Sequence, residues 1–237
     1  FTLLARSLAA RGIPVLRFDY RGMGDSEGAQ RQFDDIDDDL RAAVDHFTGP
    51  AFGVSEVVLW GLCDGASAAL FYAGLDARVK GLVLANPWAR SADGIARTTL
   101  KHYYRRRLVD PAFWRKIFSG RFNPAVAGRS LLRMLGAAAA GPQGQGSGAA
   151  PGQRAPLRER MLAGLAGFKG HVLLLTSGVD LTAQEFLELE KSSGAWKAAL
   201  ARPQVSRKTL ADADHTFSKR TWRDQVASHT ADWIESW

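Results

Sequence analysis

The sequence is poor in residues that would place it outside the cell or in a membrane. It contains a single cysteine, so an intramolecular disulfide is excluded. Free cysteine fits a reducing compartment, and we expect a cytoplasmic protein. No run of 18 uninterrupted apolar residues occurs, so the sequence predicts no membrane span. The chain also lacks an initial methionine and opens with the pattern of an amphipathic helix, "FTLLARSLAARG". This opening resembles the middle of a protein sequence.

The residues that are present indicate one large globular domain or a domain with an insertion. Apolar residues make up 46% of the 237-residue chain and charged residues 23%, both ordinary for a soluble protein. The net charge of +7 is unevenly distributed. The segment 33–40 is strongly acidic, whereas residues 90–133 hold eleven basic residues and two acidic ones. Solvated helix surface would explain either segment, but the basic one falls where a lid over an active site would lie.

Apolar strand patterns alternate with helical patterns along most of the chain. The predicted strands are nearly continuous in apolar residues and cover 12–22, 55–61, 79–88, 169–180 and the region beginning at 205. This pattern is typical of a parallel sheet covered on both faces, so we predict an α/β fold with a doubly wound, mainly parallel sheet. Residues 1–89 and 169–237 form the predicted core. A helical cap at 90–168, with a low-complexity loop at 136–156, interrupts it.

The single cysteine lies on a sharp turn between a predicted strand and a predicted helix. The stretch "GLCDGASA" (61–68) has the pattern Gly-x-Cys-x-Gly of a nucleophile elbow, in which small residues let strand and helix approach. The helix N-terminus favours a thiolate at Cys63. The backbone N–H of Asp64 would be one oxyanion donor. The alternative is that Cys63 is a small buried hydrophobic residue.

An acid and a histidine follow later predicted strands in the order expected for a hydrolase triad. Asp180 ends "LLLTSGVD", and His215 ends "ADADH" 35 residues later. His215 would take the thiol proton, and Asp180 would orient the imidazole. Alternatively, His215 is a turn residue and Asp180 only caps the next helix. Asp212 and Asp214 are rival acids, although they lie very close in sequence to His215.

These segments resemble a known family. "FTLLARSLAARGIPVLRFDYRGMGDSEG", "GLCDGASAAL" and "ADADHTFS" are similar to the α/β-hydrolase superfamily. More narrowly they resemble the exosortase A system-associated hydrolase 1 family, which is found with bacterial exopolysaccharide gene sets. The resemblance implies a triad of Cys63, Asp180 and His215, similar in type to that of dienelactone hydrolases. Members of the superfamily carry earlier strands, one of which leads to a second oxyanion donor. We therefore expect this chain to be a fragment or to have an incomplete oxyanion hole.

The expected function is hydrolysis of an ester or thioester through an acyl-thioenzyme. A non-catalytic relative that binds a partner, or an acyltransferase with the same triad, would fit the same residues. The substrate is expected to be an anionic small molecule or carrier-linked acyl group, without nucleic acid, metal or cofactor, and the oligomeric state stays open. Basic residues of the cap would bind it, namely Lys101, Arg105, Arg106, Arg107 and Arg115.

Overall fold

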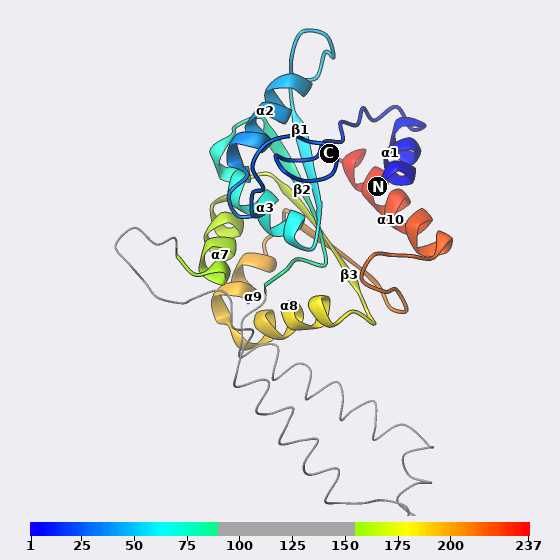
Figure 1. The fold of residues 1–237 in the computed structure, drawn as a ribbon. Helices are drawn as coiled ribbons and strands as arrows, with labels where there is room; N and C mark the ends of the chain where they lie inside the picture. Colours follow the sequence, from blue (N-terminus) through cyan, green and yellow to red (C-terminus); the bar gives the residue numbers. More distant parts are fainter. Residues whose placement is uncertain (90–154) are drawn as a thin grey trace, which may run out of the picture. The chain divides into compact units, whose positions relative to one another are not determined.

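The computed structural model of the protein describes residues 1–89 and 155–237. By its internal contacts the chain divides into two compact units, Phe1–Ala89 with Pro156–Trp237 and Arg90–Ala155. The first unit is a sheet with helices on both faces (Figure 1). The low-complexity loop and most of the predicted cap lie outside the described residues.

The sheet has four parallel strands, in agreement with the predicted α/β class. They are β1 (Val57–Leu62), β2 (Val79–Ala85), β3 (His171–Ser177) and β4 (Val205–Leu210), adjacent in that order. The register aligns their carboxyl ends, since Ala85 is opposite both Leu62 and Leu175. All four strands therefore deliver the residues that follow them to one edge of the sheet, where α/β proteins place their sites.

Helices cover the two faces of the sheet unequally. On one face lie α1 (Thr2–Ala9) and α10 (Arg220–Ile234), which contact each other (Figure 1). The other helices are α2 (Asp37–Phe47), α3 (Asp64–Tyr72), η1 (Ala73–Leu75), α7 (Leu157–Gly167), α8 (Leu181–Ser192) and α9 (Gly194–Leu200). The sequence analysis assigned α7 to the cap, and in the structure it packs against α3 in the first unit. Among the described residues, no helix combines the length and the apolar character needed to cross a membrane.

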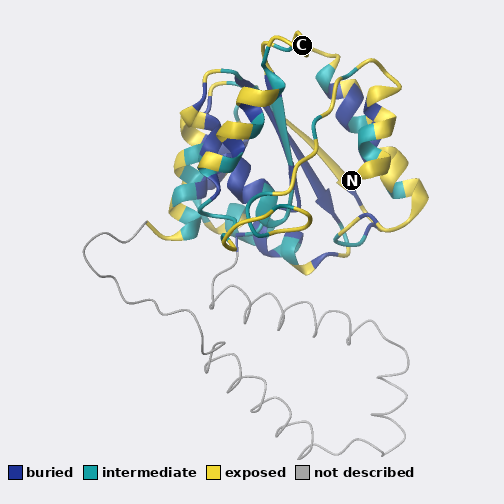
Figure 2. Ribbon diagram, turned by 45° about the horizontal axis from the view of Figure 1, so that its top comes forward, coloured by how far each residue is buried: buried dark blue, intermediate teal, exposed yellow. Residues whose placement is uncertain are grey.

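The hydrophobic core lies in two layers, one on each face of the sheet. Leu82 and Leu84 of β2 point into the layer beneath α2, α3, α7 and α9. The alternate residues Val83 and Ala85 point into the layer beneath α10. Figure 2 shows the buried residues gathered on the strands and on the helix surfaces that face them. Because both faces of β2 and β3 are covered, the continuous apolar sequences of these strands are explained.

The prediction of a buried strand over 12–22 is wrong. Residues 13–20 form neither a helix nor a strand and belong to no ladder within the described part of the chain. Val15 and Phe18 are 38% and 45% exposed. The apolar pattern alone does not make a strand, because a strand needs a neighbour whose backbone it can pair with. The segment instead crosses an apolar cleft.

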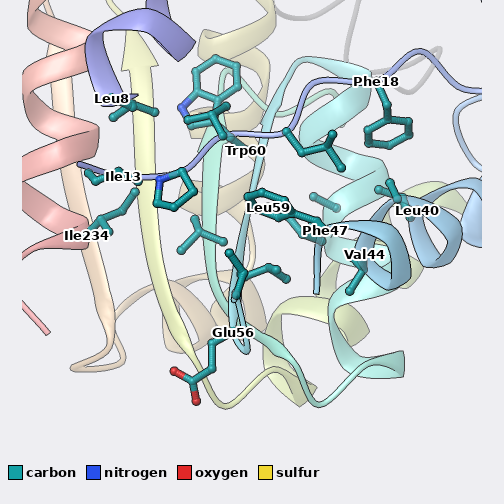
Figure 3. A pocket seen from close by; sticks show the side chains of 18 of the residues that line it. Leu8, Ile13, Phe18, Leu40, Val44, Phe47, Glu56, Leu59, Trp60 and Ile234 are labelled. Atoms are coloured by element: carbon teal, nitrogen blue, oxygen red, sulfur yellow. The ribbon is translucent and has the colours of Figure 1, made fainter. Parts of the chain in front are cut away.

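This cleft separates residues 13–20 from β1 and has a volume of about 520 Å³. Figure 3 shows side chains that line it, among them Leu8 of α1, Val44 of α2, Trp60 of β1 and Ile234 of α10. At one end it reaches the first turns of α3. The outer side of β1 is therefore lined by apolar groups rather than by a further strand of the described chain.

Candidate active site

The predicted nucleophile lies at a strained turn. Cys63 follows β1, serves as the N-cap residue of α3, and has φ 60° and ψ −118°. A side chain other than glycine rarely adopts this conformation, which costs on the order of 1–3 kcal/mol and is typical of functional turns. The backbone around it is anchored, because its N–H donates to the Ala85 carbonyl at 2.9 Å. Its own carbonyl accepts from the N–H groups of Ser67 (3.3 Å) and Trp88 (3.1 Å).

Only one of the two glycines at the turn is sterically required. A Cβ added to Gly61 would lie 2.3 Å from the backbone C and O of Gly65, so the close approach of β1 and α3 depends on Gly61. A Cβ on Gly65 would meet no heavy atom of the described chain within 4 Å. The expectation that both positions must be small is therefore wrong for Gly65, which already lies within the first turn of α3.

The predicted acid and histidine are hydrogen-bonded to each other. His215 Nδ1 lies 2.8 Å from Asp180 Oδ2, and Asp180 is 8% exposed. Asp180 also caps α8, because its carboxylate accepts from the N–H groups of Thr182 (3.2 Å) and Ala183 (2.9 Å). The capping alternative is therefore correct as well, because the same Asp180 carboxylate caps α8 and contacts His215. An ionised carboxylate only accepts, so His215 donates from Nδ1 and its Nε2 is left as a base.

The rival acids are placed differently. Asp214 accepts hydrogen bonds from the hydroxyl and the backbone N–H of Ser218, which hold the pKa of Asp214 below its usual value. Its carboxylate is thus directed toward the turn before α10. No hydrogen bond joins the Asp212 side chain to His215 within the described part of the chain.

The strand ends bring Cys63 and His215 to the same region. The Cys63 N–H bonds the last carbonyl of β2, and the side chain of the next residue, Asn86, donates to the His215 carbonyl at 2.9 Å. Asp64 opens α3, where the first N–H groups have no intrahelical partner, and its carboxylate accepts from the Gly65 N–H. The five basic cap residues lie outside the described residues.

Two polar residues of this region were not predicted as part of the site. Asn86 and Ser177 are fully buried at the ends of β2 and β3 and contact the loop that carries His215. An asparagine directly after the apolar run "VKGLVLA" was the available signal. Within residues 1–89 and 155–237, no three histidine, cysteine or carboxylate side chains gather in a way that could hold a metal ion.

Comparison with known proteins places this geometry in a family. The sequence profile described as serine aminopeptidase, S33, matches residues 1–123, which is more than half of the chain. The chain belongs to the serine aminopeptidase S33 family. It differs from the family's description at the elbow, where it carries cysteine. A search among curated protein sequences gave no significant match.

Solved structures that are similar to this S33 family member have the α/β-hydrolase fold. A Pyrococcus furiosus esterase is 16% identical with a TM-score of 0.60, over 98% of this chain and 73% of its own. A Paleococcus ferrophilus monoacylglycerol lipase is 15% identical with a TM-score of 0.57, over 98% and 87%. A lidless serine hydrolase from Xanthomonas campestris is 17% identical with a TM-score of 0.54, over 100% and 72%. At these identities the likeness establishes the fold.

Proposed function

We propose that the protein hydrolyses an ester or thioester, with Cys63 as nucleophile, His215 as general base and acid, and Asp180 as the residue that orients His215. One observation carries the proposal. The only cysteine of the chain occupies the strained strand-to-helix turn of an S33 family member. The hydrogen-bonded pair of Asp180 and His215 at the same edge of the sheet supports it.

In the first half of the reaction the acyl group moves to the enzyme. Nε2 of His215 takes the thiol proton of Cys63, and the sulfur attacks the acyl carbon. The carbonyl oxygen becomes an oxyanion, to which the backbone N–H of Asp64 donates. When the intermediate collapses, the bond to the leaving oxygen or sulfur breaks, and the leaving group takes the proton from His215. The acyl group is now a thioester on Cys63.

In the second half water replaces the thiol. Nε2 of His215 takes a proton from water, and the resulting hydroxide attacks the thioester carbon. The bond between carbon and the Cys63 sulfur breaks, the acid is released, and the thiolate recovers the proton from His215. The carboxylate of Asp180 stabilises the imidazolium in both halves without itself being protonated.

Ester and thioester bonds suit this nucleophile better than amides do. A thiolate is itself a good leaving group, so an intermediate formed on an amide reverts by expelling Cys63 unless the amine is first protonated. Thiolates leave as easily as Cys63 does, and an alcohol leaves once His215 protonates it, because alkoxides and thiolates are both much better leaving groups than amide anions. A thiolate also attacks activated acyl groups without the strong base that serine requires.

The substrate class follows from charge and from the family resemblance. We propose that the part of the predicted cap that lies outside the first unit, residues 90–155, binds an anionic acyl substrate, with Lys101, Arg105, Arg106, Arg107 and Arg115 as the contacting cations. The resemblance to the exosortase A system-associated hydrolase 1 family suggests an acyl group linked to exopolysaccharide biosynthesis. The rate with such a substrate should fall as salt rises, whereas the rate with a neutral aryl acetate should not.

The deciding experiment follows the acyl group on the protein. The purified chain is mixed with a panel of acyl thioesters and aryl esters, and mass spectrometry records any acyl adduct on Cys63 while product release is timed. We expect an adduct that forms and then turns over. Cys63→Ala should lose both, with a rate at least about a thousandfold lower. Its thermal midpoint should stay unchanged, since the side chain projects from the turn.

Three other outcomes would overturn parts of the proposal. Activity within about tenfold of the parent in Cys63→Ala would exclude the nucleophile. Tight binding of an acyl substrate with neither adduct nor turnover would make the protein a binding relative. Transfer of the acyl group to an added saccharide, in preference to water, would make it an acyltransferase.

Cys63→Ser should also hydrolyse the substrate slowly, because a serine hydroxyl ionises far less readily than a thiol.

A further inference from the structure

Two fully buried polar side chains lie behind His215, and the reaction described above does not use them. Asn86 directly follows β2, and Ser177 is the last residue of β3. Both are 0% exposed. Burying an amide and a hydroxyl in an apolar layer is unfavourable unless each finds hydrogen-bond partners. The hydrogen-bond partners of these two residues therefore indicate what the residues hold in place.

Their hydrogen bonds form a closed set around the histidine loop. Asn86 Oδ1 accepts from the Ser177 N–H at 2.8 Å. Asn86 Nδ2 donates to Ser177 Oγ at 2.8 Å and to the His215 carbonyl at 2.9 Å. Ser177 Oγ in turn donates to the Asp214 carbonyl at 2.8 Å. Two side chains thus hold two successive carbonyls of the loop that carries the imidazole.

The chemistry of these contacts fixes the orientation of the amide. Both protons of Asn86 Nδ2 are used, and each faces an acceptor, while Oδ1 faces an N–H. A rotated amide would point its oxygen at the His215 carbonyl and its NH₂ at the Ser177 N–H, so two attractive contacts would become repulsive. These hydrogen bonds therefore permit only one orientation of the Asn86 amide and hold the amide rigidly.

The backbone of Asn86 explains why asparagine is the residue at this position. It has φ 43°, in the left-handed region that asparagine adopts more readily than most residues. Its N–H donates to the Leu175 carbonyl at 2.9 Å, which ties the turn to β3. Glycine would tolerate the same backbone but could not provide the carboxamide. Asparagine supplies both the turn and the contacts.

We infer that Asn86 and Ser177 are positioning residues of the candidate active site. They fasten the Asp214 and His215 carbonyls to the ends of β2 and β3, and so hold the imidazole against Asp180 with Nε2 available to Cys63. The inference rests on the proposed function. It also explains how the imidazole of His215 is held in position. This side chain is 33% exposed, and Asp180 is its hydrogen-bonding partner. A displacement of about 1 Å of a catalytic group can lower a rate about a hundredfold.

The neighbouring residue provides a matched control. Thr176 is also buried on β3, and its hydroxyl is 2.8 Å from that of Thr209 on β4. It makes a strand-to-strand contact and does not touch the histidine loop. Thr176→Val and Asn86→Asp are both close to isosteric and both disturb a buried hydrogen bond. Asn86→Asp, however, replaces the NH₂ group by an oxygen that opposes the His215 carbonyl.

The experiment measures the histidine itself as well as the rate. The Nδ1 proton of an imidazole held by a carboxylate gives a protected downfield proton NMR signal in water. We expect Asn86→Asp to lose this signal and to lower kcat about a hundredfold with KM within about threefold. Thr176→Val should keep both the signal and kcat. If Asn86→Asp matched Thr176→Val in both measurements, the inference would be overturned.

A milder variant covers the case in which Asn86→Asp fails to fold. Ser177→Ala removes the donor to the Asp214 carbonyl but leaves the bond from Asn86 to the His215 carbonyl, and it should lower kcat about tenfold. Its signal should be weakened, and an unchanged signal would count against the inference. Because the NMR signal does not depend on turnover, a parent protein that shows it but hydrolyses nothing would refute the proposed function alone.

Discussion

The two outer strands of the sheet lead to the two reactive groups of the candidate site, and their sequences differ sharply. β1, "VVLWGL", is apolar throughout and faces the cleft beneath residues 13–20. β4, "VSRKTL", is mostly exposed and carries Arg207 and Lys208. Charged residues of this kind protect a sheet edge from pairing with other chains, whereas a continuous apolar sequence is typical of an interior strand. Of the two outer strands of the described sheet, only β4 has the charged sequence that is typical of an exposed sheet edge.

The reactive groups are held by different means on the two sides. Beyond β1, Cys63 is positioned by its own backbone, through a positive φ and the close approach of Gly61 to α3. Beyond β4, His215 is positioned by side chains, namely Asp180, Asn86 and Ser177. Substitutions near the nucleophile should therefore act through packing and folding. Substitutions near the histidine should act through rate while the fold survives.

The largest effect on stability is expected on the β1 side, from Gly61→Ala. Its Cβ would lie 2.3 Å from backbone atoms of Gly65, so strand and helix would have to move apart. We expect the free energy of unfolding, measured by urea denaturation, to fall by about 3 kcal/mol or more. The matched variant Gly65→Ala should be neutral or more stable by up to about 1 kcal/mol, because alanine favours a helix. Equal losses in the two variants would contradict the steric account of the turn.

On the β4 side the effect should appear in the rate. Asp180→Asn keeps a residue that caps helices well, so α8 should remain intact. The amide cannot hold His215 in the required tautomer, and kcat should fall by about 10⁴. Asp214→Asn should leave kcat within about threefold, because Asp214 bonds Ser218 instead of the ring. If Asp214→Asn were crippling and Asp180→Asn harmless, Asp214 would be the acid.

Much of the fold could be predicted from the sequence, because its strands and helices have strong local patterns. The parallel class was confirmed. The strand over 12–22 was wrong because pairing depends on a neighbour rather than on local sequence. The helical pattern after Asp180 does not show where α8 ends and α9 begins, which the structure places at Ser193, whose side chain caps α9.

The candidate site was only partly readable. Cys63 and Asp180 follow apolar runs and His215 follows a predicted strand, so their place at the carboxyl edge could be anticipated, while their catalytic roles stay predictions. The contacts of Asn86 could not, because its partners Ser177 and His215 lie 91 and 129 residues further along the chain. Sequence patterns report which face or end a residue occupies. They do not report which distant polar groups it will meet.

The smallest effect is expected from charging the cleft beside β1. Val15 lines the cleft and is 38% exposed, and Leu75 is 56% exposed but lies outside it. Because both side chains are exposed, Val15→Lys and Leu75→Lys should each change the free energy of unfolding by no more than about 0.5 kcal/mol. An apolar surface of this kind should bind the dye anilinonaphthalene sulfonate. Val15→Lys should reduce its fluorescence by about twofold or more, and Leu75→Lys should not. The lysine also attracts the dye's sulfonate, so a loss of fluorescence would mean that apolar contact outweighs charge. Equal fluorescence in the two variants would show that the dye does not bind this cleft. The β1 edge would then differ from the β4 edge in sequence, but it would expose no apolar surface that β4 lacks.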